Sequence, residues 1–224
     1  MPINQSPIRT LKFSKKEAIK FGWEKVMANF WPWVLIMAVY IGLNYLPAYL
    51  LDKTPYQGDF TDLIKVLLTL AVFALNLIMA LGLIRVTLKV YDNQVPRVED
   101  LFNDARYIFR FFGATLLYGL MVLGGLLLFI VPGVIWLVKY YFVPYFILEG
   151  NEVFNAFHKS ARLTKDSKGN LFVLFLLLFL IGILGALVLG IGLVIATPIV
   201  SLAITYVYRK LKEQTQNTNI ELDF

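Results

Sequence analysis

The sequence predicts an all-α fold, a polytopic transmembrane helix bundle of about six spans with interfacial amphipathic helices. Apolar residues make up 58% of the 224 positions and charged residues only 16%, a balance that water-soluble domains do not show. The charges fall in bands that separate four uncharged stretches, each about long enough to cross a bilayer core as a helix. The stretches are Val26 to Leu51, Val66 to Ile84, Phe112 to Val138 and Leu171 to Tyr208.

The first 27 residues are expected to form a cytoplasmic N-terminus that contains an amphipathic helix. Six basic side chains lie in the first 25 residues, which have no apolar core of their own. This is not the usual order of a cleavable signal peptide. The first stretch is therefore predicted to act as an uncleaved anchor, with the first two spans near residues 28–50 and 63–85.

The third uncharged stretch is interrupted by Pro132 and Gly133, which are expected to form a turn at the far membrane face. The turn divides the stretch into spans near residues 110–130 and 134–148. The returning span has only 15 residues and contains Lys139 and Pro144. We therefore expect it to be kinked, tilted or partly buried by its neighbours.

The last uncharged stretch has 38 residues, which at about 1.5 Å per residue is nearly twice the thickness of a bilayer core. It must therefore fold back on itself. Gly185, Gly190 and Gly192, followed by Pro198, predict a reversal between Gly190 and Pro198. The last two spans are placed near 171–190 and 193–210, the transmembrane domain covers 28–211, and 212–224 form a cytoplasmic polar tail.

The distribution of lysine and arginine predicts the orientation. The segments before the first span, between spans two and three, between spans four and five, and after span six hold six, five, four and three basic residues. The loop from Asp52 to Asp62 holds one lysine and three acids. Because positive charge stays on the cytoplasmic side, both termini are expected inside. The net charge of +6 then reflects topology and anionic lipid, and nucleic acid is not expected as a partner.

A polar segment with helical spacing of its apolar residues precedes each outward-going span. The first opens with a capping-box pattern from Ser14 to Glu17, and the second follows Pro96. We expect three helices on the inner membrane surface, either as parts of a unit repeated three times or as ordinary flanks of helical hairpins. Their apolar positions are Ile19, Trp23, Val26 and Phe30, then Leu101, Ala105, Ile108 and Phe112, then Val153, Phe157 and Ala161.

Three polar side chains within the predicted spans are candidates for contact with a ligand or lipid. Lys139 is the only charged residue away from the ends of the predicted spans. It is interpreted either as a lysine that extends its ammonium to the outer headgroups or as a cation in a pocket for an anionic ligand such as a lipid head. Asn44 and Asn76 are expected to form interhelical hydrogen bonds.

Other motifs predict packing and not chemistry. Gly182, Ala186 and Gly190 recur at every fourth position, which is typical of a seam that lets helices approach closely. The chain has no cysteine and only one histidine, His158, so no cofactor, no thiolate or histidine-cluster metal site and no catalytic residue is expected. No phosphate-binding loop with its lysine is present.

The second half of the chain resembles a bacterial inner-membrane family that includes the uncharacterised YciC-like proteins and the membrane domain beside some glycerophosphodiester phosphodiesterases. The resemblance covers residues 95 to 211 and implies a fold and a bacterial inner-membrane location, without catalytic residues; relatives tend to carry a basic residue at Lys139. The residues that carry it are Val131-Pro132-Gly133-Val134, Phe146-Ile147-Leu148-Glu149-Gly150, Ala156, Ser160, Arg162-Leu163-Thr164, Leu171-Phe172, Pro198, Tyr208 and Leu211.

Three classes of function are compatible with these features. The first is a non-enzymatic membrane module with a structural, regulatory or partner-binding role. The second is a small transporter or lipid-handling protein with a pocket near the short fourth span, since broken helices form such pockets in known carriers. An intramembrane enzyme is the least favoured, because no paired carboxylates or activated nucleophile lie within the spans. The partners expected are membrane lipids, and a membrane protein or a second copy of the chain.

Overall fold

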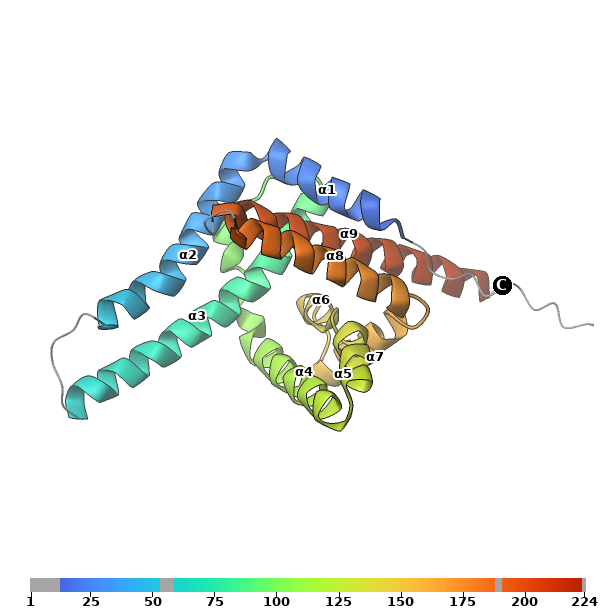
Figure 1. Cartoon of the computed structure of the whole chain (residues 1–224). Helices are drawn as coiled ribbons and strands as arrows, with labels where there is room; N and C mark the ends of the chain where they lie inside the picture. The colour runs from blue at the N-terminus through green and yellow to red at the C-terminus, as the bar shows by residue number, and fades with distance from the viewer. Residues whose placement is uncertain (1–12, 53–58, 188–190, 223–224) are drawn as a thin grey trace, which may run out of the picture.

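The computed structural model describes residues 13–52, 59–187 and 191–222, and within these ranges every regular element is a helix. Figure 1 shows the hairpins α2–α3 and α8–α9, with the shorter α4–α5 hairpin beside them. The elements are α1 (Lys15–Ala28), α2 (Phe30–Asp52), α3 (Asp59–Tyr91), the 3₁₀ helices η1 (Val98–Leu101) and η2 (Ala105–Tyr107), α4 (Ile108–Leu128), α5 (Ile130–Lys139), α6 (Val143–Leu148), α7 (Val153–Leu163), α8 (Lys168–Leu187) and α9 (Ile191–Leu222).

Five segments of the described chain are long and apolar enough to cross a membrane, as a multi-pass helix bundle requires. They are Asp62–Tyr91, Val98–Leu128, Ile130–Leu148, Lys168–Leu187 and Gly192–Gln216. The predicted first span falls on α2. Its segment Phe30–Leu43 meets the same standard only together with α1, and the two are bent by 92°. Most side chains from residue 44 to the end of α2 lie outside the described part.

The corner between α1 and α2 is built by local hydrogen bonds. The Glu17 amide N–H donates to Ser14 Oγ over 3.3 Å, so α1 begins where the capping-box pattern predicts. Asn29 ends the helix, and its side-chain amide donates to the Lys25 carbonyl oxygen over 3.3 Å. A side chain that satisfies a terminal carbonyl stabilises the end of a helix, and the chain leaves it in a new direction.

The buried face of α1 differs from the predicted amphipathic face. Trp23, which was expected on the apolar side, is 54% exposed. The helix packs along α9 instead (Figure 1), and its buried residues are Ala18, Gly22 and Val26. A Cβ at Gly22 would lie 2.5 Å from the Ile199 carbonyl oxygen. Glycine at this position therefore sets how close α1 and α9 can lie.

The second predicted amphipathic helix does not form. Residues 97–107 contain the short helices η1 and η2 joined by a turn, and of the predicted apolar face Leu101 is buried while Ala105 and Phe112 are exposed. The Leu101 carbonyl lies against α3, where a Cβ at Gly82 would be 2.0 Å from its oxygen. An α-helix would direct this carbonyl along its own axis, so the close approach to α3 requires another backbone conformation.

The turn between α4 and α5 lies at Phe129, whose backbone is extended. This corrects the prediction of a turn at Pro132 and Gly133, both of which lie in the first turn of α5. Proline is tolerated there because the first N–H groups of a helix have no partner within it. Gly133 faces Gly125 of α4, and a Cβ on Gly125 would lie 2.8 Å from the Gly133 Cα. These glycines hold the two helices together.

The third predicted amphipathic helix is α7, which packs on α6. Its buried residues are Ala156, Phe157, Ser160 and Leu163. Only Phe157 belongs to the predicted apolar face, since Val153 and Ala161 are half-buried. The buried face of α7 therefore differs from the predicted apolar face. It packs against the protein and does not serve a lipid surface alone.

The reversal between α8 and α9 lies before Pro198, which is inside α9 and buried. The prediction of a helix-breaking proline is therefore corrected. A proline in a helix leaves the carbonyl four residues earlier without its N–H partner, but here the helix continues. The close approach of α8 and α9 is at Gly185 and Gly192, where a Cβ on Gly192 would lie 2.4 Å from the Gly185 carbonyl oxygen.

Two clusters of buried apolar side chains form the core, and α9 contributes to both. One cluster surrounds α6 and includes Phe142, Ile147 and Tyr208. The other joins α1, α2, α3 and α9 and includes Trp33 and Met79. Because α9 and α3 take part in both clusters, these two helices form the frame against which the rest of the chain is positioned.

Candidate functional site

The fourth predicted span is broken, as its length and proline predict. The helix α5 ends at Lys139 and α6 begins at Val143, with Pro144 in its first turn. Proline has no N–H to donate and disfavours a helical conformation in the residue before it. Residues 140–142 therefore form a turn. The helix α6 that follows is buried along almost its whole length.

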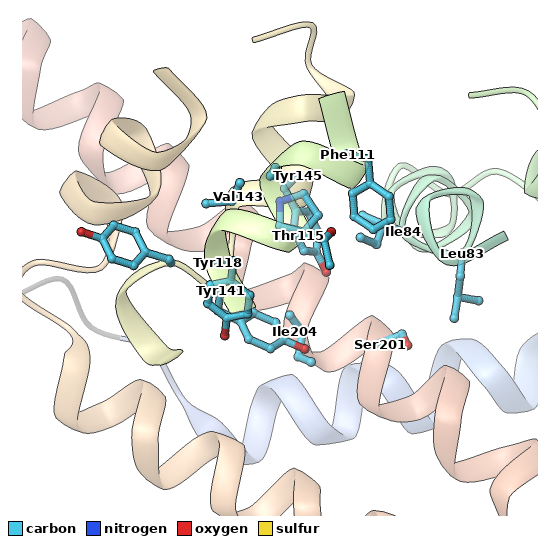
Figure 2. Close-up of a pocket in the computed structure, with 13 residues that line it drawn as sticks. Leu83, Ile84, Phe111, Thr115, Tyr118, Tyr141, Val143, Tyr145, Ser201 and Ile204 are labelled. Atoms are coloured by element: carbon cyan, nitrogen blue, oxygen red, sulfur yellow. The ribbon is translucent and has the colours of Figure 1, made fainter. Parts of the chain in front are cut away.

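An apolar cavity of about 270 Å³ lies against this break. Figure 2 shows side chains from α3, α4, the break with α6, and α9 gathered around one space. Aliphatic and aromatic groups dominate its walls, and the polar atoms are a few hydroxyls. The lining residues are Leu83, Ile84, Phe111, Ala114, Thr115, Tyr118, Tyr140, Tyr141, Val143, Pro144, Tyr145, Ser201 and Ile204.

Two tyrosines of the apolar cavity are fixed by hydrogen bonds to the protein. The Tyr118 hydroxyl donates to the Leu137 carbonyl oxygen over 3.0 Å. The Tyr145 hydroxyl lies 3.1 Å from Thr205 Oγ1. Since these hydroxyls already have partners, the tyrosines present their ring faces and edges to the space. The cavity is therefore suited to an apolar group.

A chain of buried hydroxyls continues from Tyr145 toward one end of the bundle. Thr205 Oγ1 donates to Thr87 Oγ1 over 2.8 Å, and Thr87 Oγ1 donates in turn to the Ile84 carbonyl oxygen over 2.8 Å. Both threonines are fully buried. Hydrogen bonds of this kind join helices where apolar packing alone does not select one register. Here they fix α3, α6 and α9 relative to one another.

A polar crevice of about 340 Å³ opens beyond the hydroxyl chain, at the C-terminal ends of α3 and α6 and beside α9. Unlike the apolar cavity, it is lined mainly by charged and amide side chains. The residues that line it are Arg85, Leu88, Lys89, Asp92, Gln94, Leu148, Glu149 and Arg209.

Two buried carboxylates that do not line the crevice pair with its two α3 cations. Arg85 donates to Asp104 through two nitrogens, Nε over 2.6 Å and Nη2 over 2.8 Å, and Lys89 pairs with Asp100. The side chains of Asp104 and Asp100 are only 4% and 2% exposed. A carboxylate this deeply buried is stable only when it is paired. The two ion pairs therefore add to the packing of Leu101 in holding the segment 97–107 on α3.

The opposite wall of the crevice is formed by α9 and the end of α6. Arg209 Nη2 donates to Asp92 over 2.8 Å. Glu149 accepts hydrogen bonds from the Tyr208 hydroxyl over 2.7 Å and from Lys212 Nζ over 2.5 Å. The Tyr208 ring lies among three other aromatic rings, so the phenol that positions Glu149 is itself held rigidly.

Lys139 lies at the end of α5 that is near α7, and not near the turn at Phe129. Its backbone carbonyl accepts hydrogen bonds from Ser160 Oγ over 2.9 Å and from Thr164 Oγ1 over 3.2 Å. Its ammonium lies 4.9 Å from the centre of the Tyr140 ring. The side chain is not among those that line the apolar cavity or the polar crevice. The interpretation in which it extends to the outer headgroups stays a prediction.

The other candidate residues do not gather at one site. The Asn76 side chain donates to the Val72 carbonyl of its own helix over 3.0 Å, which differs from the interhelical bond expected. Asn44 lies in α2, but its side chain is outside the described residues. Gly182 and Ala186 line a shallow groove between α8 and α9, and a Cβ at Gly182 would meet nothing within 4 Å.

Gly190, the third member of that predicted seam, lies outside the described residues. The single histidine, His158, is exposed on α7. Within the described ranges, no group of three or more histidine, aspartate or glutamate side chains lies close enough to hold a metal ion.

The residues of the polar crevice are not predicted by the sequence. Arg85 and its partner Asp104 are 19 residues apart, and Lys89 and Asp100 are 11 apart. One signal is present in the sequence. The cations Arg85 and Lys89 are four positions apart before a turn, and the acids Asp100 and Asp104 are four positions apart after it. This spacing would align two ion pairs between antiparallel segments. The two segments are too far apart in the sequence for the sequence alone to assign the pairs.

Comparison of the chain with protein-family models, with curated proteins and with solved structures found no match in any of the three.

Proposed function

We infer that this protein is a non-enzymatic integral membrane protein that binds the apolar part of a lipid-like molecule in the cavity at its broken fourth span. The observation that carries the proposal is the apolar cavity itself. It is formed where α5 ends and α6 begins, and four separate elements of the bundle line it.

The size and chemistry of the cavity favour a narrow apolar group. Ligand sites usually measure about 300 to 1,000 Å³ and combine apolar walls with a few placed polar groups. The cavity, at about 270 Å³, is near the lower limit of that range. It would hold a segment of one acyl chain and not a whole lipid. The hydroxyls of Tyr118 and Tyr145 have protein partners, so these two tyrosines would contact a ligand mainly through their rings.

The cavity favours the lipid-handling function over the partner-binding module. A partner-binding role needs an exposed surface with a defined occupant, whereas the cavity lies inside the bundle against the break. The partner-binding module stays a prediction from the sequence. Relationship to the YciC-like family also remains a proposal, supported by the residues of the second half of the chain.

We place the protein in a bacterial inner membrane with both termini in the cytoplasm, on the basis of the charge distribution and that resemblance. Reporter domains fused after Phe224 and after Gly58 should report opposite sides of the membrane, with Phe224 inside. The same side for both fusions would contradict the six-span topology.

The cavity can be tested by filling it. Thr115 lines the cavity and is exposed at its edge, while its neighbour Leu116 is exposed and does not line it. The protein would be purified in a mild detergent, and the lipid that remains bound would be counted by native mass spectrometry. Thr115→Trp should reduce bound lipid several-fold, while Leu116→Trp should leave it unchanged. Equal lipid content in the two variants would contradict the proposal.

A further inference from the structure

The polar crevice carries both signs of charge in nearly equal amounts. Three cations and two carboxylates line it. Two further carboxylates, Asp100 and Asp104, balance Lys89 and Arg85 from behind, and Lys212 pairs with Glu149. The crevice with its partners is thus close to neutral. A ligand with a net negative charge would have to compete with these carboxylates for every cation.

A neutral site that holds fixed charges of both signs is complementary to a zwitterion. Arg209 and Lys89 can donate to phosphate oxygens, and charge-assisted bonds of this kind are the strongest hydrogen bonds in proteins. Asp92 and Glu149 can accept from an ammonium group. The cations retain access to the space, since their side chains are roughly a third exposed.

One donor in the crevice has no partner. Arg209 Nε is buried and makes no hydrogen bond with the described residues, although Nη2 of the same guanidinium is bonded to Asp92. Buried donors are nearly always satisfied in folded proteins. An acceptor brought by a ligand, such as a phosphate oxygen, would satisfy this group with a small movement of the side chain.

Some elements contribute residues to both the crevice and the apolar cavity. On two of them, a residue that lines the cavity is followed about one helical turn later by a residue that lines the crevice. On α3, Ile84 lines the cavity and Leu88 the crevice; after the break, Tyr145 lines the cavity and Glu149 the crevice. Four residues of helix correspond to about 6 Å. Along α9, Thr205 falls between Ile204 of the cavity and Arg209 of the crevice, and its hydroxyl bonds Thr87 of α3.

We propose that the polar crevice binds a phosphate ester that carries a nearby ammonium, the headgroup of a phosphatidylethanolamine, while the apolar cavity holds part of its acyl chain. The phosphate lies at Arg209 and Lys89, and the ammonium lies at Glu149 and Asp92. This inference rests on the proposed function of the cavity and adds the class of lipid.

The test compares two lipids with identical acyl chains, phosphatidylethanolamine and phosphatidylglycerol, offered in equal amounts to the delipidated protein in detergent. Native mass spectrometry should show a preference of about tenfold for phosphatidylethanolamine, equivalent to roughly one well-formed ionic contact. Glu149→Gln keeps the acceptor for Tyr208 but removes the charge, and Arg209→Gln removes the phosphate donor. Glu149→Gln should abolish the preference, whereas Arg209→Gln should weaken the binding of both lipids several-fold, because both carry the phosphate. Lys210→Gln, on the same helix and paired with Glu213 outside the crevice, should retain both the preference and the binding.

Melting temperatures measured in parallel separate loss of binding from loss of folding. If Arg209→Gln does not fold, Arg209→Lys retains the charge and should show a smaller loss of binding for both lipids. Free phosphoethanolamine should compete only weakly, because it lacks the chain; competition as strong as that of the lipid would overturn the joint site.

The two proposals fail separately. Equal binding of both lipids by the unmodified protein, a preference that survives in Glu149→Gln, or unchanged binding of both lipids by Arg209→Gln overturns the headgroup inference. If Thr115→Trp still removes both lipids in that case, the proposed function stands. If bound lipid survives in Thr115→Trp, the proposed function is overturned instead.

Discussion

The segment 97–107 and the α4–α5 hairpin each make a close backbone contact at glycine, but they differ in what else secures them. The first packs its Leu101 carbonyl against Gly82 and adds two buried ion pairs to α3. The second packs Gly125 against Gly133, while the leucines at its tip, such as Leu127, are exposed. The segment 97–107 pairs with cations of the polar crevice without lining it, whereas α4 of the hairpin builds a wall of the apolar cavity.

This difference follows from the two solvents that a membrane protein meets. Within hydrocarbon, apolar side chains gain little by leaving lipid for protein, so helices associate through close packing at small residues. Near the membrane surface, charges can be kept if they are paired. A site made of both regions is therefore amphipathic, and each region can be weakened without changing the other.

The largest effect is expected from Asp104→Ala, which leaves Arg85 without its bidentate partner. Removing one member of a buried ion pair destabilises a protein by about 3 to 5 kcal/mol, and the partly exposed Arg85 places this case at the lower limit. Thermal unfolding in detergent measures the change. The control is Glu99→Ala in the same segment, because Glu99 is 65% exposed in its pair with Arg97 and such pairs contribute at most about 1 kcal/mol. Similar losses in both variants would contradict the role given to burial.

A smaller effect is expected from Gly125→Ala. The new Cβ would lie 2.8 Å from the Gly133 Cα, so α4 and α5 would have to separate. Overpacking of this kind destabilises by about 1 to 3 kcal/mol, and lipid retention should fall with it because the cavity wall moves.

The matched control is the neighbouring residue. A Cβ at Gly124 meets nothing within 4 Å, so Gly124→Ala should be neutral or should stabilise the helix by up to about 1 kcal/mol. Equal melting temperatures for the two alanine variants would mean that the glycine contact does not hold the hairpin.

The smallest effect is expected where the two regions meet, from Thr205→Val. This change removes the hydroxyl between Tyr145 and Thr87 and keeps the side-chain shape. Hydrogen bonds between membrane helices contribute about 1 kcal/mol or less. Thr69→Val is the control, since the Thr69 hydroxyl bonds only the Lys65 carbonyl of its own helix. A melting temperature that drops no further for Thr205→Val than for Thr69→Val would exclude the hydroxyl chain as a link.

Features that depend on neighbouring residues could be predicted from the sequence. The uncharged stretches predict the apolar helices, Ser14 predicts the start of α1, and Pro144 predicts the break in the fourth span. Features that depend on distant residues could not. The conformation of residues 97–107 is decided by the approach of Leu101 to Gly82, and Pro198 is accommodated inside α9. The residues of the polar crevice are not predictable for the same reason, because the partners of Arg85 and Lys89 come from another segment.

The most direct test of the central claim is to map where a lipid chain lies. The delipidated protein in detergent would receive less than one equivalent of a phosphatidylethanolamine with a photoreactive acyl chain, and the labelled residues would be identified by peptide mass spectrometry. We predict labelling at residues that line the apolar cavity, namely Phe111, Ala114, Thr115, Tyr118, Tyr140, Tyr141 and Tyr145. Labelling that instead follows exposure, with Leu127 and Phe129 at the tip of the α4–α5 hairpin marked most strongly, would contradict the account.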